Sequence, residues 1–356
     1  MQAGETSTAE RFKWLFKWQE QTIVRRDFPR LESVGDAGNH PVISGNHPAT
    51  MSAEFPSYLA LWRTGQLQQR AEQALAALSD CALCARQCHA NRLSEPPNGA
   101  FCRTGRLAIV SSAFPHHGEE YCLRGHNGSG TIFFCNCNLR CVFCQNFDIS
   151  WEACGRPVDA QTLARMMLRL QQAGCHNINF VTPSHVVAQI LEALVIAVEQ
   201  GLRLPLVYNT GGYDRVETLR LLEGVFDIYM PDLKLLDPAA AKQYMNAEDY
   251  PQVACDALRE MHRQVGVLEL DSSGLARRGV LVRHLVMPGH SEDTRRVMRF
   301  LAREISPDTF VNVMAQYHPA GYARRYPPLD RPLSLAEYRE ALRTAKEEGL
   351  HRFARD

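Results

Sequence analysis

Cysteines are concentrated in two short stretches of this 356-residue chain. Cys137, Cys141 and Cys144 follow a short apolar run with the spacing C-x3-C-x2-C. Three thiolates on one loop can bind three irons of a [4Fe-4S] cluster and leave the fourth iron open to another ligand. Zinc is the competing ion, but a structural zinc site requires a closed set of four ligands. The spacing therefore predicts an iron–sulfur centre with one open position.

Cys135 lies two residues before this motif and could act as a fourth ligand, which would close the cluster. A C-x-C pair around one cluster is sterically cramped, because both sulfurs come from nearly the same point of the chain. We therefore expect Cys135 to be a reduced thiol packed beneath the loop.

A second group consists of Cys81, Cys84, Cys88 and Cys102, with the spacing C-x2-C-x3-C-x13-C. Four soft ligands form a complete set, which suits either tetrahedral zinc or a fully ligated auxiliary iron–sulfur cluster. The spacing does not choose between these two metals. The remaining four cysteines are scattered, and we expect them to be small buried apolar residues: Cys122, Cys154, Cys175 and Cys255.

The overall composition excludes several classes of function. Lys and Arg together number 39, as do Asp and Glu, so no basic surface indicates a nucleic-acid partner. No apolar run is long enough to cross a bilayer, and Lys13 and Lys17 interrupt the N-terminal apolar stretch that an export signal would need. Closely spaced cysteines without such a signal favour metal ligation over disulfides. We expect a soluble cytoplasmic protein that binds neither nucleic acid nor membranes.

Short β-branched or aromatic runs alternate with longer amphipathic stretches after Gly130, which predicts βα units around a parallel sheet. Six strands are expected, near residues 131–134, 177–181, 206–209, 226–230, 279–287 and 310–314. Helices are expected near residues 57–78, 160–173, 184–200, 215–222, 238–265 (a pair) and 291–304. Glycines follow three of these helices, where a left-handed cap is favoured: Gly174, Gly201 and Gly224. The predicted fold is α/β, a partial (β/α)6 barrel of parallel strands with an N-terminal helical and cysteine-rich extension.

Four regions follow from this pattern. Residues 1–55 are an N-terminal extension whose order the sequence does not specify, and residues 56–129 form a helical, cysteine-rich metal-binding region. Residues 130–320 form the barrel, and residues 321–356 a C-terminal tail and helix. The three-cysteine motif leaves the C-terminal end of the first barrel strand, which is the end that carries active sites in such barrels.

The stretch "CNLRCVFC", residues 137–144, resembles the cluster motif of the radical S-adenosylmethionine (SAM) superfamily. Further blocks stand at successive strand ends: "VTPSH", "YNTGGYD", "DIYMPDLK", "VRHLVMPG" and "QYHPAG". Together with "CALCARQCHANRL" they resemble the poorly characterised homologues of pyruvate formate-lyase activating enzyme. The resemblance covers about residues 75 to 345.

The resemblance implies an oxidoreductase that cleaves SAM reductively at a [4Fe-4S] cluster and so forms a 5′-deoxyadenosyl radical. It also implies a low-potential electron donor and a protein substrate of the glycyl-radical type. Six parallel strands would leave a barrel open at one side, wide enough to admit an extended loop of a partner. The N-terminal cysteine region or the C-terminal tail could instead close that opening around a small molecule. A non-catalytic zinc-binding interaction module is a third interpretation.

Residues at the ends of the second and third strands are implied to bind SAM. Relatives often have a Gly-Gly-Glu run after the second strand that holds the methionyl ammonium, but this chain has Thr182 and Ser184 in that stretch and no carboxylate. Backbone carbonyls and the Ser184 hydroxyl could accept from the ammonium. Asn209 and Thr210 follow the third strand, next to glycines that permit close backbone approach.

The later strand ends complete the implied cofactor site. Asp232 resembles a ligand of the ribose or the ammonium, and Lys234 resembles a cation that faces the methionine carboxylate. Arg283 lies within the fifth strand, where a buried guanidinium needs an anionic partner that the cofactor carboxylate would supply. Gln316 and His318 end the sixth strand and are implied to contact the adenosine.

Overall fold

The computed structural model describes residues 55–94 and 96–354. The N-terminal extension predicted for residues 1–55 therefore lies outside the described residues, except for Phe55. The described chain begins with helices α2 (Tyr58–Arg63) and α3 (Gln66–Ala76), followed by a 3-10 turn, η2 (Ala77–Asp80). Gly65 separates the two helices in the left-handed region, with a φ of 73°, which glycine adopts without a steric clash.

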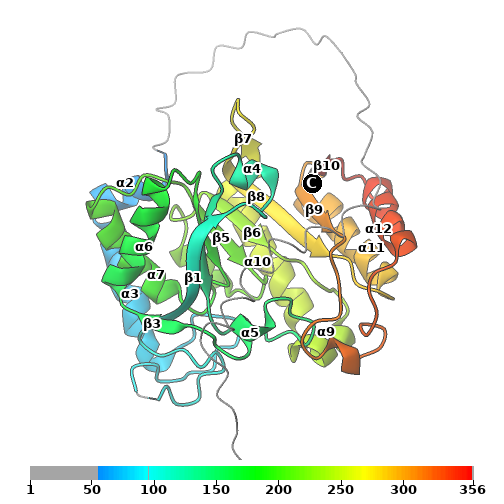
Figure 1. Ribbon diagram of the computed structural model, residues 1–356, viewed down its shortest axis with the longest axis horizontal. Helices are drawn as coiled ribbons and strands as arrows, with labels where there is room; N and C mark the ends of the chain where they lie inside the picture. Colours follow the sequence, from blue (N-terminus) through cyan, green and yellow to red (C-terminus); the bar gives the residue numbers. More distant parts are fainter. Residues whose placement is uncertain (1–54, 95, 355–356) are drawn as a thin grey trace, which may run out of the picture. The chain divides into compact units, whose positions relative to one another are not determined.

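A mixed sheet with parallel middle strands forms the centre of the fold (Figure 1). In spatial order its strands are β10 (Arg352–Phe353), β9 (Phe310–Met314), β8 (Ala276–Leu285), β6 (Ile228–Pro231), β5 (Leu206–Thr210), β4 (Ile178–Val181), β2 (Ser129–Phe134), β1 (Ala108–His116) and β3 (Arg156–Val158). The short strand β7 (Glu269–Leu270) pairs with β8. The six predicted strands are β2, β4, β5, β6, β8 and β9, and neighbours among them pair in parallel. The predicted α/β class with a partial barrel is confirmed.

Strand β1 was not predicted, and it moves the start of the sheet to Ala108, ahead of the expected boundary at residue 130. It pairs antiparallel with both β2 and β3. The register shifts between Val110 and Ser112, so a bulge interrupts the alternation of apolar and polar residues. A period-two pattern is therefore absent from the sequence of this strand.

Helices connect the parallel strands in the predicted order. They are α6 (Ala160–Gln172), α7 (Val187–Glu199), α8 (Val216–Leu221), α9 (Pro238–Met245), α10 (Tyr250–Val265) and α11 (Ser291–Phe300), which continues into a π-helical turn, η3 (Leu301–Ile305). Short helices lie at α4 (Tyr121–Arg124), α5 (Phe147–Ser150) and η4 (Ala323–Arg325), and α12 (Leu335–Glu347) is near the C-terminus. Figure 1 shows α11 beside α12 near β9, and α3 and α6 beside α7. The three glycines predicted as caps all have positive φ.

The sheet separates two apolar clusters. Residues such as Phe180, Tyr208 and Tyr229 pack with the helices in the larger cluster. The opposite side, which we call the inner face, carries Val207, Ile228, Met230 and Leu281, and these pack with Cys122 and Leu123 of α4. Alternating side chains along each strand produce this division.

Two of the expectations from composition can be compared with the structure. Three of the four scattered cysteines are buried as predicted, whereas Cys154 is exposed, because it lies in the loop between α5 and β3. Among the described residues, none of the helices has the length and apolar character that crossing a membrane requires.

Candidate active site

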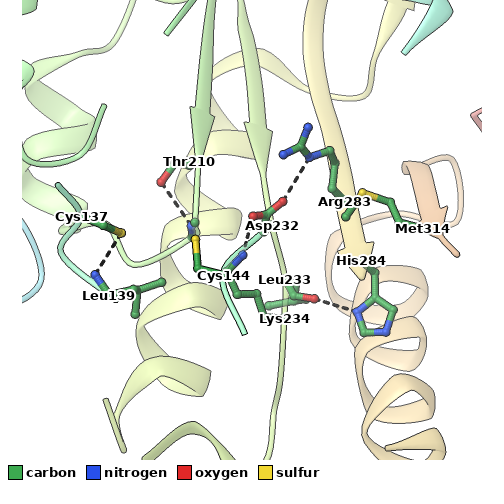
Figure 2. Close-up of polar contacts among 12 residues, drawn as sticks. Cys137, Leu139, Cys144, Thr210, Asp232, Leu233, Lys234, Arg283, His284 and Met314 are labelled. Atoms are coloured by element: carbon green, nitrogen blue, oxygen red, sulfur yellow. Dashed lines mark hydrogen bonds and ion pairs between the residues drawn. The ribbon is translucent and has the colours of Figure 1, made fainter. Parts of the chain in front are cut away.

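The three-cysteine loop leaves β2 at the C-terminal end of the parallel strands. Asn136 and Arg140 in this loop have φ values of 68° and 55°, which are rare for residues with a side chain. Such backbone conformations are concentrated at functional sites, where surrounding contacts enforce them. The Cys137 sulfur accepts the backbone N–H of Leu139 at 3.3 Å (Figure 2).

The thiols of Cys137, Cys141 and Cys144 face a common region. Burial raises the pKa of Cys141 and Cys144, and the proximity of the Cys137 thiol raises both further. The Lys234 ammonium acts in the opposite direction on both pKa values, so a cation is positioned to offset thiolate charge. Three thiols beside one cation fit a cluster with three protein ligands.

No three His, Cys, Asp or Glu side chains in the described part of the chain converge as the ligands of one metal ion. A four-iron cluster is larger than a single ion, so its ligands converge less closely. The three-cysteine loop supplies three thiols, which suits a cluster with one open iron rather than a structural zinc site with four ligands.

Cys135 has a different environment from the three thiols of the loop. Its side chain is fully buried, and its sulfur lies so close to Gly155 that a Cβ there would overlap it. Burial raises the pKa of Cys135 to about 12, with a smaller contribution from Cys154. The Cys135 carbonyl oxygen is 2.9 Å from Nε2 of the buried His185.

Arg86 of the N-terminal cysteine region fixes the position of the cluster loop. Its Nε donates to the carbonyl oxygen of Asn138 at 2.7 Å. Its two terminal nitrogens donate to the carbonyl oxygens of Asn246 and Met245, at the end of α9, at 2.6 and 3.1 Å. One guanidinium thus joins the cysteine region, the cluster loop and the α9 connection.

The second cysteine group is also brought together by the fold. Burial raises the pKa of Cys84 to about 12, and the thiols of Cys102, Cys81 and Cys88 all contribute to the increase. Arg92, which is 1% exposed, places Nη1 3.5 Å from the Cys81 sulfur.

Arg92 otherwise donates to carbonyl oxygens: Nε to that of Thr104 at 2.7 Å and Nη2 to that of Gly105 at 3.4 Å. Among the described residues no carboxylate pairs with Arg92. A buried guanidinium requires compensating negative charge, which metal-bound thiolates would provide.

A charged row follows β6 and continues onto β8. The Lys234 ammonium lies 2.5 Å from one carboxylate oxygen of Asp232, and Nε of Arg283 donates to the other at 3.1 Å (Figure 2). Burial alone would raise the pKa of Asp232, but the charges of Lys234 and Arg283 outweigh burial and lower it. Asp232 is therefore held as a carboxylate beside the cluster loop.

Two residues that sequence reasoning missed hold this row in place. The Tyr250 hydroxyl accepts the backbone N–H of Lys234 at 3.0 Å and lies 3.0 Å from the carbonyl oxygen of Gly211. His284 binds the Leu233 carbonyl through Nδ1 at 2.8 Å (Figure 2), and its Nε2 is 3.0 Å from the Thr294 hydroxyl.

Burial lowers the pKa of His284 to about 4, so the ring is neutral. It then donates from Nδ1 to the Leu233 carbonyl and accepts from the Thr294 hydroxyl at Nε2. The block "VRHLVMPG" contains His284, but only Arg283 was predicted as a site residue, because a buried guanidinium needs an anionic partner.

The ends of β4 and β5 meet through hydrogen bonds. Thr182 has a φ of 62°, and its N–H donates to the Asn209 carbonyl at 2.9 Å. The hydroxyls of Ser184 and Thr210 are 2.9 Å apart, and Thr210 donates to Asp214 at 2.5 Å. These two hydroxyls thus belong to a buried network around Asp214, which the sequence did not indicate.

The end of β9 reaches the cluster loop. Gln316 and His318 are exposed, and Nδ1 of His318 lies 3.3 Å from the Gln316 carbonyl oxygen. That same oxygen accepts from Nε2 of Gln145, the residue after Cys144, at 3.2 Å. The structure thus places the two residues implied for adenosine binding beside the loop.

An aromatic group covers the loop from the other side. Phe147 stacks on Trp151, and Tyr322 of the C-terminal tail meets both rings edge-on. Trp151 Nε1 donates to the Cys141 carbonyl at 3.2 Å, and the Tyr322 N–H donates to the Val142 carbonyl at 2.8 Å. The tail therefore packs directly on the cluster loop.

Comparison with known proteins places this geometry in a family. The model of the radical SAM superfamily matches residues 131–301, which include the cysteine loop and the charged row. An uncharacterised protein of Methanocaldococcus jannaschii, MJ0674, is 31% identical over 294 residues, which cover 80% of this chain and 79% of that protein. The chain belongs to the radical SAM superfamily, whose members use SAM and a [4Fe-4S] cluster.

Solved structures show a more distant likeness. The crystal structure of Streptococcus suis SuiB is 16% identical with a TM-score of 0.43, and it matches 62% of this chain and 47% of its own. SuiB bound to its precursor peptide SuiA gives 14% and 0.41, with 62% of this chain and 46% of that chain covered. The chain thus spans about half the length of these structures.

Proposed function

We propose that the protein holds its [4Fe-4S] cluster on Cys137, Cys141 and Cys144 and abstracts hydrogen from a polypeptide partner, as glycyl-radical activases do. The observation that carries this proposal is the position of the three-thiol loop beside the row of Lys234, Asp232 and Arg283. When bound, the cluster and SAM together supply a 5′-deoxyadenosyl radical, given an electron from a low-potential donor.

The residues of the charged row are suited to bind the polar groups of the methionyl part of SAM and of its ribose. Lys234 and Arg283 offer cations to the methionyl carboxylate, and Asp232 accepts from the ammonium or from ribose hydroxyls. The Ser184 oxygen and the carbonyl oxygen at Thr182 offer further acceptors for the ammonium.

Four more of the predicted cofactor contacts lie around these groups. Asn209 and Thr210 shape the end of β5, and Gln316 and His318 are close enough to the loop to receive the adenosine. The rings of Phe147, Trp151 and Tyr322 exclude water from the loop, which favours controlled radical chemistry.

Access for an extended polypeptide is supported by the sheet order. The sheet runs from β10 to β3 and does not close on itself, so a barrel built from it has an open side. The alternative is a small-molecule substrate, which is favoured by the packing of Arg86 and Tyr322 on the cluster loop, since both narrow the approach. A non-catalytic zinc module is disfavoured by membership of the superfamily.

The second cysteine group is proposed to hold zinc or an auxiliary iron–sulfur cluster. Support comes from the mutual proximity of Cys81, Cys84, Cys88 and Cys102 and from the buried guanidinium of Arg92 beside Cys81. A cytoplasmic location is also proposed, supported by the free thiols of the two cysteine groups, which form no disulfide bonds.

The substrate class can be tested by anaerobic incubation of the reconstituted protein with lysate fractions separated by mass. Formation of 5′-deoxyadenosine above the uncoupled background is measured together with electron paramagnetic resonance. Stimulation by a protein fraction, with a protein-centred radical, supports the activase proposal. Stimulation confined to the small-molecule fraction rejects that proposal while leaving the radical chemistry in place.

A further inference from the structure

The segment between β1 and α4 brings two acidic residues to the inner face of the sheet. Glu119 Oε2 is 3.5 Å from Nη1 of Arg283, and its side chain is 7% exposed. Glu120 Oε1 accepts from Nδ2 of Asn312 at 2.8 Å. Arg283 and Asn312 are paired neighbours on β8 and β9, so the segment reaches across the inner face from β1. Glu119 is thus connected to Asp232 through Arg283, which contacts both carboxyl groups.

The charges in this network do not balance. Three carboxyl groups, those of Asp232, Glu119 and Glu120, face two cations, Lys234 and Arg283. Burial raises the pKa of Glu119 to about 8, with the neighbouring Glu120 carboxyl as the second cause. Glu119 therefore retains its proton near neutral pH in the absence of another cation.

Histidine does not supply the missing charge. His116 Nδ1 lies 3.8 Å from Glu119 Oε1, but burial lowers the pKa of this histidine, with His117 and Arg283 lowering it further. The position next to the acidic pair is therefore suited to a cation that comes from outside the network.

Buried polar atoms without partners lie on the same inner face. Glu120 is 8% exposed, and its Oε2 has no hydrogen-bond partner among the described residues. Asn179 is fully buried, and neither of its amide atoms has a partner there. Each such group loses its hydration without compensation, which a bound ligand would relieve.

Strand register shows that Asn179 points toward the inner face. It pairs with Val207, which packs with Cys122 and Leu123 of α4, the helix that begins after Glu120. It also pairs with Thr131, which in turn pairs with Phe114 of β1. Residues in register on neighbouring strands share a face.

Aromatic rings line the same region. Phe114 of β1 stacks on Phe133 of β2 with centroids 5.6 Å apart, and His116 meets Phe133 edge-on at 5.9 Å. Phe114 is 39% exposed, so part of its ring is available to a ligand. Aromatic faces attract cations, and they do so more strongly where water is excluded.

We propose that Glu119 and Glu120, with Asn179 and the rings of Phe114 and Phe133, bind a cationic nitrogen group of the substrate. The group is the ammonium or guanidinium of a Lys or Arg side chain near the site of hydrogen abstraction. This inference deepens the proposed function and rests on its assignment of a polypeptide substrate. Binding of the cation displaces the proton that Glu119 retains, and Asn179 offers a second acceptor for an N–H group.

The experiment uses the full-length protein, purified anaerobically, with butylammonium and butylguanidinium as probes and butyrate and butyramide as comparison ligands. Calorimetry in buffers of different ionisation enthalpy gives the affinity and the number of protons released. The cationic probes should bind and release protons near pH 7. Because binding releases a proton, their affinity should increase about tenfold for each unit by which the pH rises toward 8.

Variants separate the acidic pair from general effects of charge. Glu120→Gln should weaken binding of the cationic probes at least tenfold, and Glu119→Gln should remove the pH dependence. The control is Glu192→Gln, a carboxylate that pairs with Arg106 away from the inner face and should leave binding unchanged. Phe114→Leu keeps an apolar side chain and should weaken binding of the cations even if the Glu120 variant folds poorly.

The proposal is overturned if butyrate or butyramide binds as tightly as the cations, or if the cations bind equally to the wild type, Glu120→Gln and Phe114→Leu. Because binding is measured without SAM or reductant, the result does not depend on radical chemistry. A protein that binds the cations but is stimulated only by small molecules in the lysate test would retain this subsite and lose the polypeptide assignment.

Discussion

Cys135 and Cys141 lie six positions apart in the chain and have opposite surroundings. Cys141 shares its environment with two other thiols and Lys234, whereas the Cys135 sulfur packs against Gly155. Replacing Cys141 by Ala should abolish the cluster, because two thiolates do not hold it firmly. Cys135→Ala should leave at least 80% of the iron in place, by the same assignment of ligands.

The measurement is the iron content of separately reconstituted variants. Equal loss of iron in the two variants would require Cys135 to be added to the ligand set.

Histidine burial predicts loss of stability in acid. The pKa of His284 in the folded protein is about 4, below its ordinary value of 6.5, so the unfolded chain takes up the proton first as the pH falls. Stability is then lost between about pH 6.5 and 4, by roughly 2 kcal/mol at pH 5. Urea unfolding at pH 7 and pH 5 should show a smaller loss in His284→Gln than in the wild type.

His351 provides the control for this prediction, because it is exposed and pairs with Asp308 at the surface. His351→Gln should follow the wild-type pH dependence. If His284→Gln loses as much stability as the wild type between the two pH values, His284 is not the group that titrates.

Residue-level chemistry was only partly visible in the sequence. The cysteine spacing and the strand-end position of Asp232 and Lys234 are local patterns, so they could be predicted. Tyr250 contacts Lys234 from α10, and Glu119 contacts Arg283 from a loop before the first parallel strand. Such contacts depend on how distant segments of the chain pack together, which no local sequence pattern predicts.

At the scale of elements, the N-terminal cysteine region acts as a support for the cluster loop through Arg86. Its bonds to the carbonyl oxygens of Asn138, Met245 and Asn246 are charge-assisted. Arg86→Ala should reduce stability by roughly 2 kcal/mol and lower the iron content after reconstitution by at least half. Urea unfolding and iron analysis measure the two effects.

Arg259→Ala is the matched control, because Arg259 forms ion pairs with Asp256 and Glu304 at the surface and does not contact the loop in the described structure. It should retain the full iron content. Wild-type iron content in Arg86→Ala would show that the loop does not need this support.

The second cysteine group is predicted to be structural, because four ligands leave no open coordination position. Cys84→Ala should lower Tm by roughly 5 °C or more, since the metal no longer stabilises the fold. Cys255→Ala, which removes a buried thiol outside both groups, is the control for loss of packing alone. A Cys84 variant with normal Tm that cannot reduce the catalytic cluster would instead indicate electron transfer through this site.

Element prediction succeeded where strands are parallel and buried on both faces. In the sequence such strands are short apolar runs. This holds for β2, β4, β5, β6, β8 and β9. The antiparallel strands β1 and β3, of which β3 is the edge strand, are partly exposed, and a bulge in β1 breaks the alternation. The pairing of β1 with β2, and of β3 with β1, depends on tertiary contacts that the sequence pattern does not show.

At the scale of the whole molecule, the sheet brings the residues proposed to bind cofactor and substrate into one region. Its C-terminal edge presents the cluster loop and the charged row, while its inner face carries the acidic pair and the aromatic rings. The row from Lys234 through Asp232 and Arg283 to Glu119 is continuous in the structure. Cofactor and substrate would thus be bound by adjoining parts of one network.

The central claim is that the loop of Cys137, Cys141 and Cys144 holds the cluster that cleaves SAM. The most direct measurement is the yield of 5′-deoxyadenosine and methionine from the reconstituted protein under anaerobic reduction with dithionite. The wild type should form both products in equal amounts, and Cys141→Ala should form neither. Equal yields from the two proteins, or no product from a wild type with its full iron content, would contradict the account.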